Sequence, residues 1–229
     1  VQTSTAGTLG EHGERINEES RSTASSSRVP TFRTKWEGEQ EVRRVLERGL
    51  DAVIVNPSNF TGPYDRGNWS RFFFMVRDGK LPGAPPGRYS WAHVREVARG
   101  HLGAARRGRT GENYLLAGAD ATMLEVLGII GELVGRPAPR RTVPPVVLRG
   151  LGWASHLASC VTRREPDITP EGVEMLLSQP LFDCSKAVRE LGYRPAPLRQ
   201  IFEDCHSWLV EAHLLVAGAS GAPAPGPRA

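Results

Sequence analysis

Residues 30–55 read PTFRTKWEGEQEVRRVLERGLDAVIV, a helix-type pattern followed by a strand-type pattern. The first part carries apolar side chains at helical spacing and closes on Gly49, a residue that commonly ends helices. The run DAVIV at 51–55 is apolar and β-branched, which is typical of a strand buried on both faces of a parallel sheet. A helix, a short glycine turn and a buried strand form the second half of a β-α-β unit. The stretch therefore predicts an α/β fold.

Strand-type and loop-type patterns flank this unit. The chain opens on VQTST at 1–5, a short strand-type run that ends in hydroxyl residues, and NYLLA at 113–117 is another strand candidate. The loop NPSNFTGPYD at 56–65 follows the buried strand directly. In open α/β sheets, ligands bind at the carboxyl ends of parallel strands. We therefore expect this loop to face a ligand.

The remaining segments are mainly helical in pattern. Thr122 is expected to cap one helix, with Glu125 in its first turn and Gly135 at its end. The other expected helices cover residues 90–106, 144–161, 170–177, 185–191 and 197–215. Trp69 and the phenylalanines at 72–74 are expected in the core or in a lid over a pocket. Residues 11–29 read as a loop, and the small-residue segment after 216 reads as a disordered tail.

The composition is that of a globular protein. The chain has 229 residues, 39% of them hydrophobic and 24% charged. Its net charge is +4 and its pI is about 9.2, but basic and acidic residues are interspersed, which argues against a nucleic-acid partner. The apolar stretches are too short or too polar to span a bilayer. We expect a protein without a membrane or nucleic-acid partner.

The cysteines carry no metal or disulfide signature. Cys160, Cys184 and Cys205 lie far apart and show no CxxC spacing. We therefore expect neither a zinc site nor a disulfide framework, and a reducing, cytoplasmic location. His93 and His101 fall on one predicted helix too far apart to share a metal ion, so the prediction is that no metal is bound.

Lys35 is the first candidate for chemistry. It lies in the first turn of the predicted helix, and residue 31 lies one turn earlier on the same face. A hydroxyl held there beside the ammonium could move a proton onto or off a substrate oxygen. The residue is Thr31, whose aliphatic hydroxyl is a far weaker acid than a phenol. Phe32 has a ring without a hydroxyl, and it lies about 100° around the helix.

Taken together, five segments resemble the extended short-chain dehydrogenase/reductase family, which includes nucleotide-sugar epimerases, dehydratases and dihydroflavonol reductases. They are VQTSTAGTLG at 1–10, TKWEGEQEV at 34–42, VIVNPSNFTGPYD at 53–65, YSWAHVREVARGHLGA at 89–104 and FDCSKAVRELGYRP at 182–195. The resemblance covers nearly all of residues 1–215. Within the family, the segments are most similar to the dihydroflavonol-reductase-like and hopanoid-associated sugar epimerase branch.

The resemblance implies a fold and a domain division. The fold would be the C-terminal part of a Rossmann-type doubly wound parallel sheet with a small, mostly helical substrate-binding lobe. Residues 1–125 would form a partial Rossmann-type domain with a lobe insertion at about 64–90, residues 126–216 mainly the lobe, and 217–229 a disordered tail. The chain contains no GxGxxG motif and begins with Val. We therefore expect a fragment that lacks the N-terminal cofactor-binding part.

The resemblance also implies residue roles. A tyrosine four residues before the lysine transfers the proton, while the lysine lowers the tyrosine pKa and binds the cofactor ribose. Lys35 matches the lysine, Thr5 the catalytic Ser or Thr, and Thr31 stands at the tyrosine position, so proton transfer should be impaired. The implied cofactor is NAD or NADP, bound by Lys35, Pro57, Ser58, Asn59 and Phe60. Arg88 and Tyr64 are the candidates for substrate binding.

Two functions remain open at the sequence level. The first is an NAD(P)-dependent oxidoreductase or epimerase that acts on a hydroxyl or carbonyl of a small molecule, such as a nucleotide sugar or a dihydroflavonol-like compound. The second is a catalytically degenerate member of the family that serves as a binding or scaffold protein, a reading motivated by Thr31 and the missing glycine loop. The resemblance further suggests a homodimer that forms through the helix after Lys35 and the helix that precedes it.

Overall fold

The computed structural model describes residues 1–10, 15–162, 168–178 and 180–215. Its strands are β1 (Gln2–Thr3), β2 (Ile54–Pro57), β3 (Asn59–Thr61), β4 (Arg88–His93), β5 (Asn113–Leu116) and β6 (Ala119–Thr122). Its helices are α1 (Pro30–Leu46), α2 (Arg71–Arg77), α3 (Val94–Arg107), α4 (Met123–Val134), α5 (Pro145–Thr162), α6 (Pro170–Leu177), α7 (Ser185–Leu191) and α8 (Leu198–Glu211), with 3-10 turns η1 (Ala6–Thr8) and η2 (Ala24–Ser26). The expected α/β fold is confirmed.

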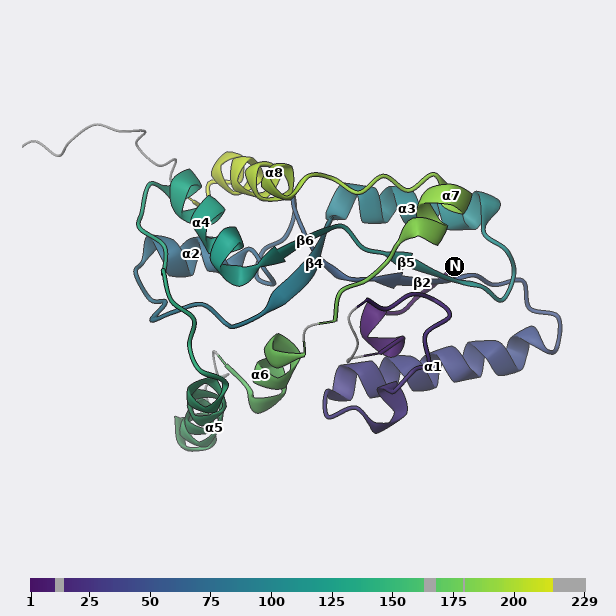
Figure 1. Ribbon diagram of the computed structural model, residues 1–229, viewed down its shortest axis with the longest axis horizontal. Helices are drawn as coiled ribbons and strands as arrows, with labels where there is room; N and C mark the ends of the chain where they lie inside the picture. The colour runs from purple at the N-terminus through teal and green to yellow at the C-terminus, as the bar shows by residue number, and fades with distance from the viewer. Residues whose placement is uncertain (11–14, 163–167, 179, 216–229) are drawn as a thin grey trace, which may run out of the picture.

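A parallel sheet with the order β1-β2-β5 forms one half of the molecule. Every residue of β2 is buried, because helices cover both faces of the sheet (Figure 1). Tyr114 and Leu116 of β5 pack in a core with residues of α3 and α7, whereas Leu115 packs in another core with η1. This alternation explains why the sequence of these strands reads as a continuous apolar run.

A second sheet joins this half to the helical lobe. Its order is β3-β4-β6, with β3 parallel and β6 antiparallel to β4. The sequence predicted a helix over 90–106, and its first turn was wrong, because Ser90 to His93 belong to β4 and α3 begins at Val94. His93 marks the true start: its Nδ1 accepts a hydrogen bond from the backbone N–H of Arg95 at 3.0 Å.

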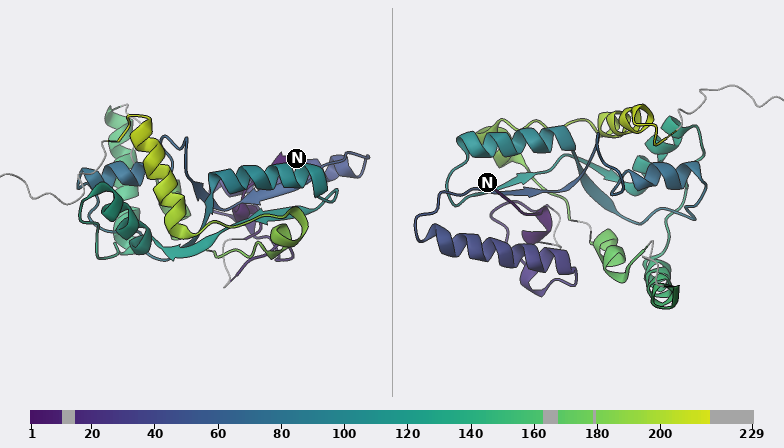
Figure 2. Two further views of the ribbon diagram at one scale, coloured as in Figure 1. Left: turned by 90° about the horizontal axis from the view of Figure 1, so that it is seen from above. Right: turned by 180° about the vertical axis from the view of Figure 1, so that it is seen from behind.

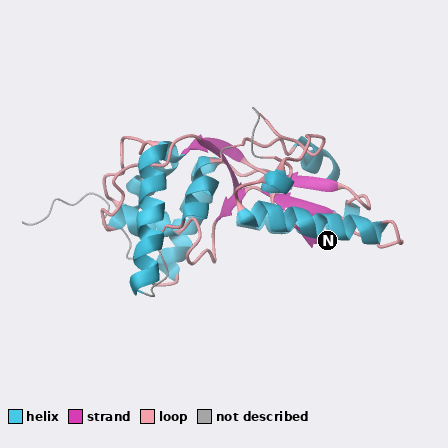
Figure 3. Cartoon of the chain, turned by 90° about the horizontal axis from the view of Figure 1, so that it is seen from below, coloured by secondary structure: helices cyan, strands magenta, loops and turns pink. Residues whose placement is uncertain are grey.

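The helical lobe is built around an aromatic core. Helices α2, α4 and α8 gather at the end of the molecule away from the parallel sheet (Figures 2 and 3). They enclose the fully buried side chains of Phe73, Trp91, Met123 and Phe202. Trp69 and the phenylalanines at 72–74 were expected in the core or in a lid, and Trp69, Phe72 and Phe73 are buried in this core, with Phe74 packed against it.

Most other predicted helices are confirmed, because their end signals are local. Thr122 and Glu125 form a reciprocal capping box at the start of α4, and Gly135 ends this helix in the left-handed conformation. Helices α6 and α7 have the predicted bounds, whereas α8 ends at Glu211 rather than continuing to 215. The sequence missed α2 and the strands β3, β4 and β6. The predicted tail at 217–229 lies outside the described residues, and the division into domains stays a prediction.

No helix within the described ranges is both long and apolar enough to cross a membrane.

Candidate active site

A cavity of about 350 Å³ lies at the carboxyl ends of β1 and β2, between the parallel sheet and the helical lobe. We call the lining residues from the end of β1, η1, α1, residues 57–60 and α3 the floor, and those from the β3–α2 segment, β4, α6 and the segment after α6 the far wall. The lining residues are Thr3, Ser4, Thr5, Ala6, Gly7, Phe32, Lys35, Pro57, Ser58, Asn59, Phe60, Asn68, Trp69, Tyr89, Val97, His101, Met175, Ser178, Pro180 and Phe182. The structure thus brings together Thr5, Lys35 and all four predicted residues of the loop.

The hydroxyl segment after β1 forms the floor. Thr5 has an extended backbone and precedes η1, so its side chain is placed where the strand ends. Ser4 is only 6% exposed, and its Oγ has no hydrogen-bond partner within the described residues. A buried hydroxyl without a partner costs free energy unless a ligand or water satisfies it. The floor therefore offers a polar group to a bound molecule.

Lys35 is fixed to this floor. Its Nζ donates a hydrogen bond to the carbonyl oxygen of Thr3 at 3.2 Å. The Thr3 hydroxyl lies 3.0 Å from Nε2 of His101, whose Nδ1 lies 2.8 Å from the carbonyl oxygen of Val97. Because an ammonium has three donors and one is used here, Lys35 can still donate to a ligand.

Phe32, rather than Thr31, faces the cavity. The Phe32 side chain is 7% exposed and lines the cavity, whereas Thr31 is exposed and is not among the lining residues. The Phe32 ring lies directly against Gly7: a Cβ atom added at residue 7 would be 2.4 Å from two ring carbons. The ring therefore occupies the cavity wall beside Lys35 without providing a hydroxyl.

A buried polar network holds the predicted segments in place. The Glu39 carboxylate, on a side chain that is 3% exposed, lies one turn after Lys35 on α1. It accepts hydrogen bonds from Thr8 Oγ1 at 2.7 Å, Asn56 Nδ2 at 2.8 Å and Asn113 Nδ2 at 3.3 Å. These donors belong to η1, β2 and β5. Glu39 therefore ties the lysine helix to the hydroxyl segment and to both strands.

The segment from Pro57, the last residue of β2, to Phe60 of β3 lines the cavity, so most of the predicted loop is strand. Ser58 is buried, and its Oγ has no hydrogen-bond partner within the described residues. Asn59 Nδ2 lies 3.4 Å from the carbonyl oxygen of Ser90, to which it donates a hydrogen bond. This bond connects the loop to β4, in addition to the parallel pairing of β3 with β4. The loop is thus positioned by backbone pairing, with Ser58 left available.

The far wall contains residues that the sequence did not predict as site residues. Trp69, Tyr89, Met175, Ser178 and Phe182 reach the cavity from widely separated parts of the chain. The Tyr89 hydroxyl donates to the carbonyl oxygen of Leu176 at 2.6 Å and lies 3.2 Å from that of Pro86. Its proton is therefore engaged by the backbone. The sequence indicated this wall only through the expectation that Trp69 could belong to a lid over a pocket.

Arg88 and Tyr64 lie outside the cavity lining. Arg88 is exposed at the start of β4. Tyr64 is 79% exposed, and its ring centroid lies 5.3 Å from that of Trp208 on α8. Their substrate-binding roles stay predictions.

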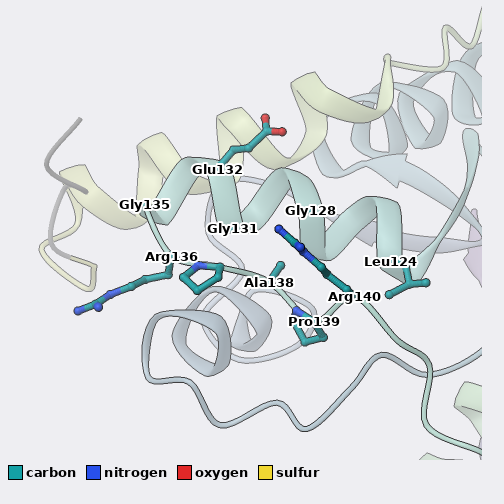
Figure 4. Close-up of a pocket in the computed structure, with 10 residues that line it drawn as sticks. Leu124, Gly128, Gly131, Glu132, Gly135, Arg136, Ala138, Pro139 and Arg140 are labelled. Atoms are coloured by element: carbon teal, nitrogen blue, oxygen red, sulfur yellow. The ribbon is translucent and has the colours of Figure 1, made fainter. Parts of the chain in front are cut away.

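A second hollow, of about 660 Å³, follows the side of α4 (Figure 4). Although larger, it is open to solvent, and its charged groups are Glu132, Arg136 and Arg140. Glu132 is paired with Arg199 of α8 at 2.5 Å. The hollow contains none of the predicted site residues, so we assign the candidate site to the cavity at the strand ends. Among the described residues, no cluster of three or more His, Cys, Asp or Glu side chains could hold a metal ion.

The model of the NAD dependent epimerase/dehydratase family matches residues 1–117, which carry the cavity floor. The chain belongs to this family. The family is consistent with the fold, because its matched region contains the parallel strands β1, β2 and β5 with the helices α1 and α3 that cover them. The resemblance inferred from the five sequence segments is thereby confirmed.

Similar proteins support the family. The chain is 31% identical over 181 residues to the protein named "Putative dihydroflavonol 4-reductase" of Synechocystis sp., covering 76% of this chain and 53% of that protein. It is 31% identical over 187 residues to Sterol demethylase protein B of Methylococcus capsulatus, covering 80% and 57%. The structure of a nucleoside-diphosphate-sugar epimerase from Pseudomonas aeruginosa shares the fold, with a TM-score of 0.73, 24% identity, and coverage of 93% and 67%. The chain thus spans about half the length of these curated relatives.

Proposed function

We propose that the chain is the catalytic and substrate-binding portion of an NAD(P)-dependent oxidoreductase or epimerase. It would act on a hydroxyl or carbonyl of a small molecule. The observation that carries this proposal is that one cavity collects Thr5, Lys35 and the loop 57–60, although these segments are separated in sequence. The membership in an NAD-dependent family agrees with it. NAD and NADP both remain candidates.

The floor of the cavity fits the reactive end of such a cofactor. Ser58 contributes a buried hydroxyl without a partner within the described residues, and Lys35 has ammonium donors to spare beyond its bond to Thr3. We infer that Lys35, Pro57, Ser58, Asn59 and Phe60 would hold the cofactor. A bound nicotinamide would supply or accept a hydride there.

Residues of this chain would orient the substrate and stabilise the charge that develops on it during the reaction. The Thr5 hydroxyl would hold the reacting oxygen, and the Lys35 ammonium would stabilise negative charge that develops on it. Proton transfer is the weak step, because Phe32 has no hydroxyl, Thr31 is exposed, and the Tyr89 proton is engaged by backbone carbonyls. We therefore expect slow turnover.

Replacing Lys35 tests the proposal. We expect Lys35→Met to lower the rate of hydride transfer by about 100-fold, within the range for loss of a group that assists proton transfer. With a ketone as substrate the rate is followed by the absorbance of the reduced nicotinamide. With UDP-glucose it is followed by the appearance of the epimeric sugar, because an epimerase returns the hydride and leaves the nicotinamide unchanged. Lys80→Met is the matched control, because Lys80 is 71% exposed and lies outside the cavity. Equal rates in the two variants would contradict the role of Lys35.

A second candidate function is a binding or scaffold protein without turnover, and the Phe32 ring on the cavity wall is the observation that favours it. The same assay separates the two functions. A scaffold would bind nicotinamide cofactor in a calorimetric titration but would show no hydride transfer in the unmodified chain.

We also infer a cytoplasmic location and a homodimer that forms through the helix after Lys35 and the helix that precedes it. Sedimentation of the purified chain measures the mass of the assembly and would show a monomer if the second inference is wrong.

A further inference from the structure

Helix α5 packs through one narrow face. Leu148 and Gly152, one turn apart, are buried, and Leu148 packs in a small core with Val173 of α6. Gly152 lets the two helices approach, because a Cβ atom there would lie 3.0 Å from a methyl group of Val173. Ser155 and Ser159 continue this face and are half-buried. The side of α5 that meets α6 is therefore mostly small or polar.

The opposite face of α5 is apolar and exposed. Val146, Trp153 and Leu157 lie within about 50° of the direction opposite the packed face, at about 100° per residue. They are 73%, 59% and 63% exposed, and Val147 and Leu151 are exposed beside them. We call these five residues the apolar patch of α5. A helix on a protein core has the reverse polarity, and an exposed patch of this kind marks an interaction surface.

The apolar patch is separate from the candidate active site. Helix α5 lies at the outer edge of the molecule, with α6 as its neighbour (Figures 1 and 2). Among the described residues that line the cavity, Met175 belongs to α6 and none belongs to α5. The patch is thus a surface that neither the cavity nor the proposed function uses.

The charges around the apolar patch have one sign. Residues 136–164 contain six arginines and neither Asp nor Glu. Arg136, Arg140 and Arg141 precede α5 and are exposed, whereas Arg149 is paired with Glu174 of α6 at 2.7 Å. A second copy seated on the patch would bring two such groups of arginines together, and like charges repel. An anionic lipid surface would instead attract them.

We propose that α5 binds the surface of an anionic lipid bilayer, with its apolar patch among the headgroups and the arginines before it on lipid phosphates. A helix with one apolar face lies in the plane of the interface. Trp153 suits this position, because indole rings favour the headgroup level. The sequence led us to expect no membrane partner, because its apolar stretches are too short or too polar to span a bilayer. A helix that lies in the interface does not need to span it.

Flotation of the 229-residue chain with vesicles tests the apolar part of this surface. The vesicles contain phosphatidylcholine and phosphatidylglycerol in equal parts, and the unmodified chain is expected to float with them. We expect Leu157→Ser to weaken binding by about tenfold, because one leucine side chain is no longer buried in the interface. Leu102→Ser is the matched control, because Leu102 is 57% exposed on α3, and it should bind as the unmodified chain does.

A second pair of variants tests the charges. We expect Arg140→Gln combined with Arg141→Gln to weaken binding by about 30-fold, since each arginine near an anionic surface contributes about fivefold. Arg48→Gln combined with Arg106→Gln removes the same charge from exposed residues elsewhere and should keep most of the binding. Vesicles of phosphatidylcholine alone should bind the unmodified chain much more weakly.

Three results would overturn the proposal. The first is that the unmodified chain does not float with the anionic vesicles, or floats equally well with phosphatidylcholine alone. The second is equal binding by Leu157→Ser and Leu102→Ser. The third comes from sedimentation without lipid: an assembly that Leu157→Ser dissociates would show that a second copy covers the patch. Brominated acyl chains give a positive sign, because they should quench the fluorescence of the unmodified chain more than that of Trp153→Phe.

Discussion

At the scale of single residues, the contact between Gly7 and Phe32 shapes the cavity floor. Gly7 is buried, and any side chain there would meet the Phe32 ring. The glycine is required by this close approach rather than by its backbone angles, since it does not adopt a positive φ. The position of the ring on the cavity wall thus depends on the absence of a side chain at residue 7.

We expect Gly7→Ala to lower the free energy of unfolding by about 1–3 kcal/mol, because the new methyl group overlaps a ring that packing holds in place. Gly38→Ala on α1 is the control: a Cβ there meets nothing within 4 Å. Alanine favours helix over glycine, so that variant should gain about 0.5–1 kcal/mol. Urea unfolding measures both, and a neutral Gly7→Ala would show that the ring moves freely.

Glu39 is the second residue whose replacement has a defined effect. We expect Glu39→Gln to lower the free energy of unfolding by about 1–3 kcal/mol, because its amide nitrogen would face donors from Thr8, Asn56 and Asn113 and leave some without an acceptor. Glu41→Gln, which removes one exposed pair with Arg44, should change it by less than about 1 kcal/mol. Chemical denaturation measures the free energy of unfolding of both variants. Equal losses would show that the hydrogen bonds of Glu39 stabilise the fold no more than an exposed ion pair does.

At the scale of elements, Asp65 organises the segment between β3 and α2. Burial alone would raise the pKa of its carboxyl, but hydrogen bonds lower it overall, among them those from the Asn68 backbone N–H at 2.9 Å and the Thr61 hydroxyl at 2.8 Å. The same carboxylate accepts from the Ser70 hydroxyl at 3.0 Å. This segment contains Trp69, which lines the cavity. The hydrogen bonds of Asp65 therefore also help to hold the far wall in place.

The lowered pKa of Asp65 fixes the sign of a pH effect. Because the folded pKa lies below the unfolded one, the stabilisation is complete above about pH 4 and is lost as the pH falls through the folded pKa. Asp65→Asn should therefore be less stable at neutral pH, by about 1–2 kcal/mol, and should lose less stability on acidification. Thermal unfolding across this pH range provides the measurement, and parallel pH profiles for the two proteins would rule the effect out.

The elements that sequence could predict are those with local signals. The bounds of α6 and α7 follow from Pro170 and from Gly192, which takes the left-handed conformation at the end of α7. The strand β4 could not be predicted from the spacing of Trp91, Val94 and Val97. This spacing fits one continuous helix, and it fits equally well a strand that is followed directly by a helix. Its strand character comes from pairing with β3 and β6.

At the scale of the whole molecule, the candidate site also has a part that local sequence signals predict and a part that they do not. The floor could be found because Pro57 ends β2 and Thr5 lies two residues after β1, and the carboxyl ends of parallel strands are where ligands bind. The far wall could not, because Trp69, Tyr89 and Ser178 meet only after the helical lobe folds back over the sheet. The sequence could also not predict that Thr31 is exposed, because its exposure depends on how α1 is rotated about its axis relative to η1.

The cavity also lies where separate hydrophobic cores meet. Trp69 belongs to the core of the helical lobe, Val97 to the core under α3 and α7, and Phe182 to the core beside η1, and all three side chains line the cavity. A molecule bound there touches every one of these cores at once. We therefore expect a bound molecule to couple the unfolding of the three cores, so that the chain unfolds more cooperatively when the cavity is occupied.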